Sequence, residues 1–170
     1  MSKPTITGRQ YAVKSNPGSR AERTEAGDAM SELVVHVFRL NGLLTATGDA
    51  MAEPAGQTSA RWRVLAAIET TPLTVPQIAG AWWLSRQSVQ RVADLLVDEG
   101  FAAYEDNPDH RRSKLVRITR RGSAALRRIR GAQRAWADEL GARIGEADIR
   151  AANAILGRIV RAMAIEQTAP

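Results

Sequence analysis

Residues 72–122 read PLTVPQIAGAWWLSRQSVQRVADLLVDEGFAAYEDNPDHRRSKLVRITRRG, and the first half of this stretch predicts two short helices. Thr74 and Gln77 have the spacing of a capping box, in which the threonine hydroxyl accepts from an amide and the glutamine reaches back to the cap. We therefore expect a helix from about Val75. It should be short, because Ser85 already offers the next N-cap.

The second of these helices is amphipathic. Its apolar residues recur at i, i+3, i+4 and i+7, as in a helix packed on a core, and they are Val89, Val92, Ala93 and Leu96. Gly100 follows the acidic pair Asp98-Glu99 and predicts the helix end. The outward face carries Gln87, Gln90, Arg91 and Asp94.

This outward face has two interpretations. Glutamine and arginine can pair with adenine and guanine edges, whereas a merely solvated helix more often carries lysine and glutamate. The alternative is ordinary exposed surface. The residues predicted to contact bases or phosphates are Ser85, Arg86, Gln87, Ser88, Gln90 and Arg91.

A predicted β-hairpin follows the second helix. Residues 101–105 and 114–118 hold β-branched or aromatic residues, and Asn107-Pro108 between them initiates a turn. The tip of the loop carries Asp109, His110, Arg111 and Arg112, with Lys114 just beyond. Its two arginines suit the negative potential of a narrow minor groove, and we expect His110 and Lys114 to contact DNA beside them. Alternatively, one arginine braces the loop by pairing with Asp109, and both roles can hold at once. Two helices and a basic hairpin in this order are the layout of a winged helix-turn-helix.

Five motifs extend this interpretation: Arg61-Trp62-Arg63-Val64-Leu65, Leu84-Ser85-Arg86-Gln87-Ser88-Val89, Asp98-Glu99-Gly100-Phe101, Asn107-Pro108-Asp109-His110-Arg111-Arg112 and Ile118-Thr119-x-x-Gly122. Together they resemble the MarR family of transcriptional regulators, closely over residues 58–123 and more loosely over the flanking helices. The resemblance implies a homodimeric winged-helix protein that binds a pseudo-palindromic DNA operator and that is often released by a small ligand. We therefore expect a sequence-specific regulator that acts as a repressor.

The resemblance has one departure. The family usually has an acidic residue directly before the paired arginines, and this chain has His110 there. Either Asp109 substitutes from one position earlier, or the histidine contacts phosphate and adds a mild pH dependence.

The charge distribution agrees with a nucleic-acid partner. The 170-residue chain has a net charge of +6 and a pI near 10.7, which would also suit an anionic membrane surface. Residues 85–130 contain 11 Lys/Arg and 6 Asp/Glu, a net charge of +5, whereas the remaining residues contain 13 and 12. We expect Lys114 and Arg120 to contact phosphates.

Composition weighs against several other functions. The chain has no cysteine, which excludes disulfides, thiolate metal sites and thiol sensing. It has two histidines and no phosphate-binding glycine motif, so we expect neither an enzyme nor a cofactor. The acidic pairs Asp98-Glu99 and Glu105-Asp106 could hold magnesium in a nuclease, but each ends a predicted element, where carboxylates ordinarily face solvent. No apolar run could span a bilayer or act as a secretory signal, and we expect a cytoplasmic protein.

The predicted organisation is mainly α with a small β wing. Residues 1–27 form a polar arm, residues 28–50 an N-terminal dimerisation helix capped by Asp28, and Gly48 to Gly56 a loop. Thr58 or Ser59 caps the next helix. The winged helix-turn-helix then occupies residues 58–121, and C-terminal dimerisation helices occupy residues 122–166.

The C-terminal third carries two apolar stripes with alternating spacings of three and four: Leu126, Ile129, Gln133, Trp136 and Leu140, then Ile149, Ala152, Leu156, Ile159 and Met163. We expect a helical hairpin joined at Gly141 to Gly145. The stripes are either internal core or an interface with a second copy, which we favour because helices outside a winged unit must bury their apolar faces somewhere. Two-fold symmetry would then separate the reading helices by roughly 34 Å, one turn of DNA.

The resemblance also suggests where an effector would bind. In relatives of the family the small-molecule site lies between the dimer helices and the winged unit, and the residues here that could line it are His36, Arg39, Trp62, Arg63 and Trp83. Cationic groups near tryptophan suit a flat anionic aromatic compound. In the alternative view both tryptophans are core, Arg63 forms an ion pair and His36 is an ordinary helix residue. A last alternative is a winged-helix module that binds another protein without ligand response, against which the local +5 charge and the arginine-tipped wing both stand.

Overall fold

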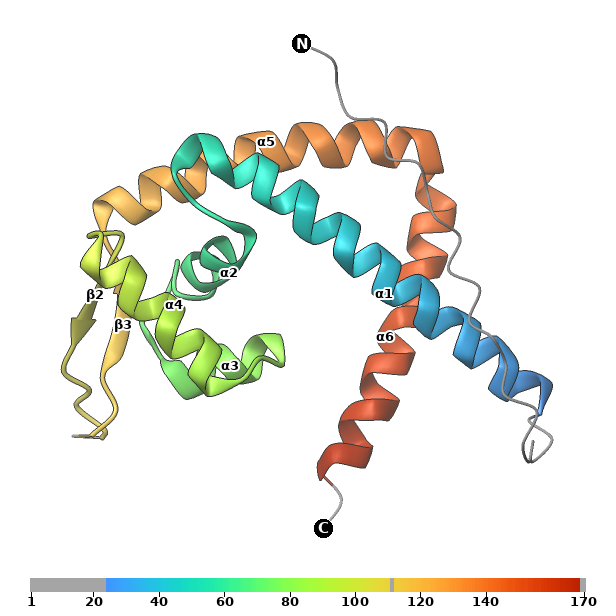
Figure 1. The fold of residues 1–170 in the computed structure, drawn as a ribbon, viewed down its shortest axis with the longest axis horizontal. Helices are drawn as coiled ribbons and strands as arrows, with labels where there is room; N and C mark the ends of the chain where they lie inside the picture. Colours follow the sequence, from blue (N-terminus) through green and yellow to red (C-terminus); the bar gives the residue numbers. More distant parts are fainter. Residues whose placement is uncertain (1–23, 111, 169–170) are drawn as a thin grey trace, which may run out of the picture. The chain divides into compact units, whose positions relative to one another are not determined.

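The computed structural model describes residues 24–110 and 112–168 and is mainly helical with a small antiparallel sheet, as predicted (Figure 1). The chain divides into two units, residues 1–41 and 42–170, which we describe separately. The predicted N-terminal arm lies almost wholly outside the described residues, and so does Arg111 of the wing. The elements are α1 (Glu25–Ala52), the 3-10 turn η1 (Glu53–Ala55), α2 (Ser59–Ala67), β1 (Leu73–Thr74), α3 (Val75–Trp82), α4 (Arg86–Asp98), β2 (Ala102–Glu105), β3 (Leu115–Ile118), α5 (Arg120–Ile144) and α6 (Glu146–Thr168).

Helix α1 begins earlier than the sequence predicted. Thr24 rather than Asp28 supplies the capping oxygen, because the Thr24 hydroxyl accepts a hydrogen bond from the Gly27 amide at 3.1 Å. Residues 25–27, which we assigned to the arm, are therefore helical. A threonine can satisfy a free first-turn amide as an aspartate does, and so two caps compete here.

The predicted loop from Gly48 to Gly56 is wrong in its first half, since α1 continues to Ala52. Gly48 is a packing position: a Cβ there would lie 3.0 Å from the Ser59 Cβ. The neighbouring Asp49 carboxylate accepts a hydrogen bond from the Ser59 amide at 2.7 Å. The turn comes at Gly56, whose φ of 68° is left-handed and favours glycine.

The helix starts of the central segment are confirmed. Thr58 caps α2, and Thr74 caps α3 in a complete capping box with Gln77. The Gln77 side chain accepts from the Thr74 amide at 2.8 Å, and the Thr74 hydroxyl accepts from the Gln77 amide at 3.4 Å. Ser85 caps α4, which ends before Gly100 in the left-handed region.

The sheet has one strand more than we predicted. Strand β3 lies in the middle of the order β1-β3-β2, and both neighbours are antiparallel to it. In the register, Tyr104 of β2 and Leu73 of β1 both face Val116. Strand β1 was missed because its two residues are too short to show an alternating pattern. It closes the edge of the wing that lies next to α3.

One hydrophobic core holds the winged segment together. Its buried side chains come from α2, α3, α4, the sheet and the start of α5, and the largest fully buried ones are Leu65, Ile68, Ile78 and Leu96. On α4, Val89, Ala93 and Leu96 are buried as predicted, and Val92 is half-buried. Figure 1 shows α3 and α4 beside each other, with the β2–β3 hairpin following α4.

The helical hairpin of the C-terminal third has a tighter joint than predicted. Residues 141–144 belong to α5, and the chain turns at Gly145 alone, with φ 98°. Leu126 and Ile129 at the start of the first stripe are buried, whereas none of residues 146–165 of α6 is buried. Within the described ranges, no helix combines the length and apolarity needed to cross a membrane.

Candidate nucleic-acid interface

The first turn of α4 places several predicted residues at the surface. The Ser85 hydroxyl accepts from the Ser88 amide at 3.1 Å and donates to the Ser88 hydroxyl at 2.8 Å. Both serine side chains therefore have partners within the turn. Arg86, Gln87 and Arg91 are exposed on the side away from the core, as the periodicity predicted.

A hollow of about 600 Å³ lies between α4 and the wing. Predicted residues line it from both sides: Arg86, Gln87 and Gln90 from α4, and Arg112 and Lys114 from the wing. The structure thus brings together two groups of cationic and amide side chains that are far apart in sequence. The lining residues that sequence reasoning missed are Val75, Pro76, Tyr104 and Ser113.

Gln90 is less free than its outward position suggested. Its Nε2 donates to the Asp94 carboxylate at 2.8 Å and to the Tyr104 hydroxyl at 2.7 Å. The Tyr104 hydroxyl in turn donates to Asp94 at 2.6 Å. Gln90 and Asp94 are four residues apart on one helix face, a spacing that could have suggested their bond. The contribution of Tyr104 from β2 depends on the tertiary fold.

The phenol of this network stays protonated near neutral pH. Burial, followed by the hydrogen bond to Asp94, raises the pKa of Tyr104 to about 12. The Tyr104 ring also packs against the hydrophobic core, and this packing positions its hydroxyl beside α4. The network therefore links the exposed face of α4 to strand β2 of the wing.

Two local hydrogen bonds shape the wing loop. The Asn107 side chain accepts from the Asp109 amide at 3.0 Å, and the Ser113 amide donates to the His110 carbonyl at 3.1 Å. Within the described part of the wing the ion pair joins Arg117 to Glu105 across β2 and β3, and it does not involve Asp109. The predicted Asp109 brace is therefore absent for Arg112, and its alternative partner Arg111 lies outside the described residues. His110 and Arg112 are exposed.

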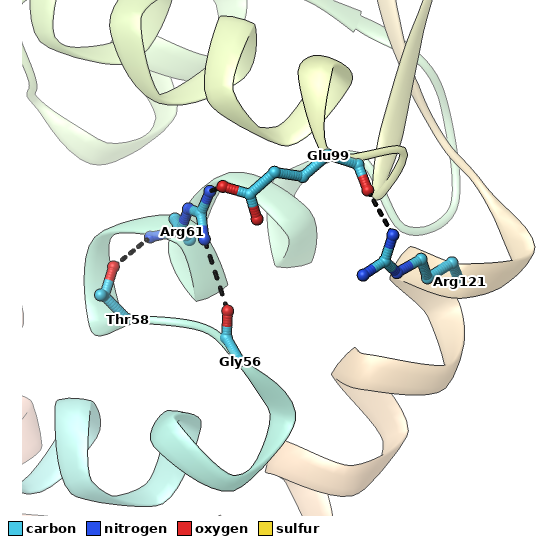
Figure 2. Close-up of polar contacts among 5 residues, drawn as sticks. All are labelled: Gly56, Thr58, Arg61, Glu99 and Arg121. Carbon is cyan, nitrogen blue, oxygen red and sulfur yellow. Dashed lines mark hydrogen bonds and ion pairs between the residues drawn. The ribbon is translucent and has the colours of Figure 1, made fainter.

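The far end of α4 is fastened to two other helices, as Figure 2 shows. The Glu99 carboxylate pairs with the guanidinium of Arg61 on α2, and the Glu99 carbonyl accepts from Arg121 of α5 at 2.6 Å. The hydrogen bond from Arg61 holds the pKa of Glu99 below its ordinary value. Arg121 also lies over the Phe101 ring, 4.3 Å from its centroid. We had not predicted this cluster.

The junction between β3 and α5 is tightly packed. Thr119 caps α5 by accepting from the Gly122 amide at 3.1 Å, and its hydroxyl lies 2.8 Å from the Gly100 carbonyl. A Cβ at Gly122 would collide with the Phe101 carbonyl and lie 2.8 Å from Ile118 Cγ1. Arg120, the predicted phosphate contact, is exposed beside this junction.

The candidate ligand residues fall in separate places. In the first unit, His36 and Arg39 are exposed on α1. In the second, Trp62 and Arg63 are half-buried on α2, so Trp62 is only partly core. Trp83 is 62% exposed with φ 52°, and its assignment to the core is wrong.

Two of these residues have identifiable neighbours. Hydrogen bonds from the Ser59 amide and hydroxyl lower the pKa of Asp49, and the charge of Arg63 adds to this effect. Arg63 therefore interacts electrostatically with the Asp49 carboxylate of its own chain. Trp83 lines an apolar hollow of about 220 Å³ with Val160, Met163 and Ala164 of α6.

One carboxylate of each acidic pair considered for magnesium forms an ion pair with an arginine. Glu99 pairs with Arg61 and Glu105 with Arg117. Across residues 24–110 and 112–168, no group of three or more histidine, aspartate or glutamate side chains could hold a metal ion.

Comparison with known proteins agrees with this architecture. A family model described as MarR family matches residues 55–113. An uncharacterized protein of Mycobacterium tuberculosis is 44% identical over 102 residues, which is 60% of this chain and 71% of that protein. The family-model match includes α3, α4 and β2 and ends before β3.

Solved structures share the fold at low sequence identity. A MarR family transcription regulator is 23% identical with a TM-score of 0.72, covering 84% of this chain and 95% of its own. A mutant MarR from E. coli complexed with operator DNA is 18% identical with a TM-score of 0.71, covering 80% and 99%. CouR from Rhodococcus jostii RHA1 bound to p-coumaroyl-CoA is 17% identical with a TM-score of 0.67, covering 76% and 92%.

Proposed function

The chain belongs to the MarR family, and we propose that it is a homodimeric, sequence-specific DNA-binding transcriptional regulator that represses a pseudo-palindromic operator and is released by a small aromatic or anionic ligand. The chain has the fold of transcription regulators. The DNA-binding, dimer and ligand parts of the proposal rest on separate observations. We expect the protein in the cytoplasm with its DNA.

The observation that carries the DNA-binding proposal is the hollow between α4 and the wing. Its walls present Arg86 and Gln87 on one side and Arg112 and Lys114 on the other. Cationic side chains on two elements can hold the phosphate backbone while amides between them face base edges. The net charge of +5 over residues 85–130 favours the same partner.

We assign the contacts by element. The exposed face of α4 enters the major groove, with Ser85, Arg86, Gln87, Ser88, Gln90 and Arg91 toward the bases and nearby phosphates. The wing approaches the minor groove with His110, Arg111 and Arg112. Lys114 and Arg120 contact phosphates. The mutant MarR solved with operator DNA, which has this fold, supports the assignment.

Exposed apolar residues support the dimer. On α6, Ile155, Leu156, Val160 and Met163 are each between 37% and 56% exposed. In the first unit, α1 likewise exposes Val34, Val37, Phe38 and Leu40. Contiguous apolar faces of this kind mark interaction surfaces. In a protein that binds a two-fold operator, a second copy of the same chain can cover them.

The ligand part of the proposal is supported by CouR, which was solved with p-coumaroyl-CoA bound. We propose that an effector would be recognised by residues drawn from His36, Arg39, Trp62, Arg63 and Trp83. A screen for compounds that release the protein from its selected DNA tests this point. Trp83→Ala should raise the effector concentration needed to release the protein from DNA. The affinity for DNA in the absence of effector should be unchanged.

Selection of bound sequences from random duplex DNA tests the main proposal. The native protein should enrich a two-fold motif, and its affinity should fall with salt at a log-log slope near −0.9 per neutralised phosphate. Arg112→Ala should weaken binding about tenfold or more, whereas Arg158→Ala on α6 should leave it unchanged. If no sequence is enriched and the salt dependence is flat, the protein-binding alternative replaces this proposal.

A further inference from the structure

The excess positive charge of residues 85–130 lies on α5. Residues 85–119, which include α4 and the wing, contain 6 Lys/Arg and 6 Asp/Glu, a net charge of zero. Residues 120–137 contain 6 arginines and no Asp or Glu, a net charge of +6. This concentration of positive charge is therefore outside the two elements that form the hollow.

Three of these arginines form a row along the exposed side of α5, which we call the arginine row: Arg120, Arg127 and Arg134. They are seven residues apart, which corresponds to about 10 Å along the helix axis and a rotation of only about 20°. The buried residues of α5 are centred about 150° away around the helix, and they are Gly122, Ala125, Leu126 and Ile129. The arginine row therefore faces away from the core.

No ion pair neutralises the arginine row within the part of the chain that the structure describes. The arginines that pair with carboxylates there are Arg61, Arg117, Arg130 and Arg150. Between Arg120 and Arg134 the same side of the helix has the small residues Ala124 and Gly131. A Cβ at Gly131 would meet nothing within 4 Å. The arginine row is therefore an open cationic strip to which a large anion can come close.

The arginine row does not face the proposed operator site. Helix α4 approaches α5 through its C-terminal end, where Arg121 donates to the Glu99 carbonyl. Arg86 and Gln87 are at the other end of this 13-residue helix, roughly 20 Å away. Figure 1 shows α5 leading away from the wing, and α2 packs against both α4 and α5. A straight duplex that lies in the hollow is therefore out of reach of the far end of the row.

The chemistry of the arginine row fits the backbone of duplex DNA. A guanidinium matches the geometry of phosphate oxygens. A duplex presents one negative charge per roughly 1.7 Å of its axis, so a straight row about 20 Å long meets phosphates along its whole length. The neighbours Ala124 and Gly131 offer neither an aromatic ring for the bases of a single strand nor an apolar anchor for a membrane. They also lack the aromatic anchors of most protein interfaces.

We propose that the arginine row of α5 binds the phosphate backbone of a second DNA duplex, so that the protein holds its operator with α4 and the wing and another duplex with α5. The contacts are to phosphates alone, and the second duplex can therefore have any sequence. This inference rests on the proposed DNA-binding function and adds to it the bridging of two DNA segments.

A bridging assay tests the inference. The selected operator, as a duplex no longer than the recovered motif, is fixed to beads, and a fluorescent duplex without the motif is added with the protein. The native protein should retain the fluorescent duplex on the beads. Arg127→Ala/Arg134→Ala should reduce this retention about fivefold or more and should lower its log-log salt slope by about 1 per arginine. The affinity of this variant for the operator in solution should be unchanged.

Arg150→Ala/Arg158→Ala on α6 is the matched control. It makes the same change in net charge, and it should retain the fluorescent duplex as the native protein does. All four replaced side chains are exposed, so thermal unfolding should show that both double variants keep the fold.

Three results would overturn the inference and leave the proposed function standing. In the first, the native protein binds the operator beads and retains no fluorescent duplex. In the second, Arg127→Ala/Arg134→Ala retains as much of this duplex as the native protein. In the third, the bead-bound native protein prefers phosphatidylserine vesicles to the fluorescent duplex at equal phosphate concentration, which would assign the row to a membrane. Failure of the native protein to enrich any sequence in the selection removes both the proposed function and the inference.

Discussion

Apolar residues that are buried in the winged segment contrast with apolar residues that are exposed on α6. Leu65, Leu96 and Val116 are fully buried by neighbours from the same chain. On α6, by contrast, Leu156 is 37% exposed and Val160 56% exposed. The sequence patterns are similar, since α4 of the winged segment and α6 both repeat apolar residues every three or four positions. The winged segment therefore buries its apolar residues within one chain, whereas α6 leaves part of its apolar face exposed.

The largest expected effect is the loss of stability when a buried side chain of the winged segment is removed. Leu96→Ala should lower the free energy of unfolding by about 3 kcal/mol, because it leaves a cavity under α4. Leu95 is the matched control on the same helix, since it is 45% exposed. Leu95→Ala should cost about 1 kcal/mol or less. Urea denaturation measures both, and equal losses would contradict the assigned inner face of α4.

Adding a methyl group at the junction of β3 and α5 should come next. Gly122→Ala should destabilise the protein by about 2 kcal/mol, because the Cβ would meet the Phe101 carbonyl and the main chain there cannot easily move. A Cβ at Gly131, further along α5, would meet nothing within 4 Å. Gly131→Ala should therefore stabilise α5 by about 0.5 kcal/mol or more. A stable Gly122→Ala variant would show that the junction is looser than described.

A charge on α6 should separate assembly from folding. Val160→Asp should raise the dimer dissociation constant at least tenfold, because a carboxylate would be placed in an apolar interface. Arg158→Ala makes the same change in net charge on nearly the opposite side of the helix, about 200° away, and should leave assembly unchanged. Sedimentation velocity at several concentrations measures both. A native protein that remains monomeric would contradict the proposed partner surface.

The smallest effect should be the pH dependence of the α1–α2 connection. Hydrogen bonds from Ser59 lower the pKa of Asp49 from its ordinary 3.8. The stability that this carboxylate contributes is therefore fully present above about pH 4 and is lost as the pH falls through its native pKa. Asp49→Asn should cost about 1 kcal/mol at pH 7 and less as the medium is acidified below pH 4. Urea titrations of the native and Asp49→Asn proteins at pH 7 and below pH 4 measure this convergence, and a constant difference would contradict it.

Much of the winged segment could be predicted because its signals are local. Capping at Thr74 and Ser85 depends on residues within one turn, and the core face of α4 repeats with the helical period. The ends of α1 were harder to predict, because Thr24 and Asp28 offer competing caps. Gly48 resembles a helix stop in sequence, but in the structure it allows Ser59 to approach.

The exposure of the candidate residues could be predicted, whereas their contacts with other elements could not. Exposure of Gln87 and Arg91 follows from helical periodicity. The bond from Gln90 to Tyr104 and the clamp of Glu99 between Arg61 and Arg121 join residues from separate elements. Such contacts depend on how elements pack, which the spacing of residues along the chain does not contain.

The double attachment of Glu99 has a mechanical consequence. Its side chain is tied to α2 and its carbonyl to α5, so a tilt of α5 that keeps these bonds must carry the end of α4 with it. Helix α4 has 13 residues and is therefore a lever roughly 20 Å long. A rotation about the Glu99 end of α4 would therefore become a larger displacement of Arg86 and Gln87 at its opposite end.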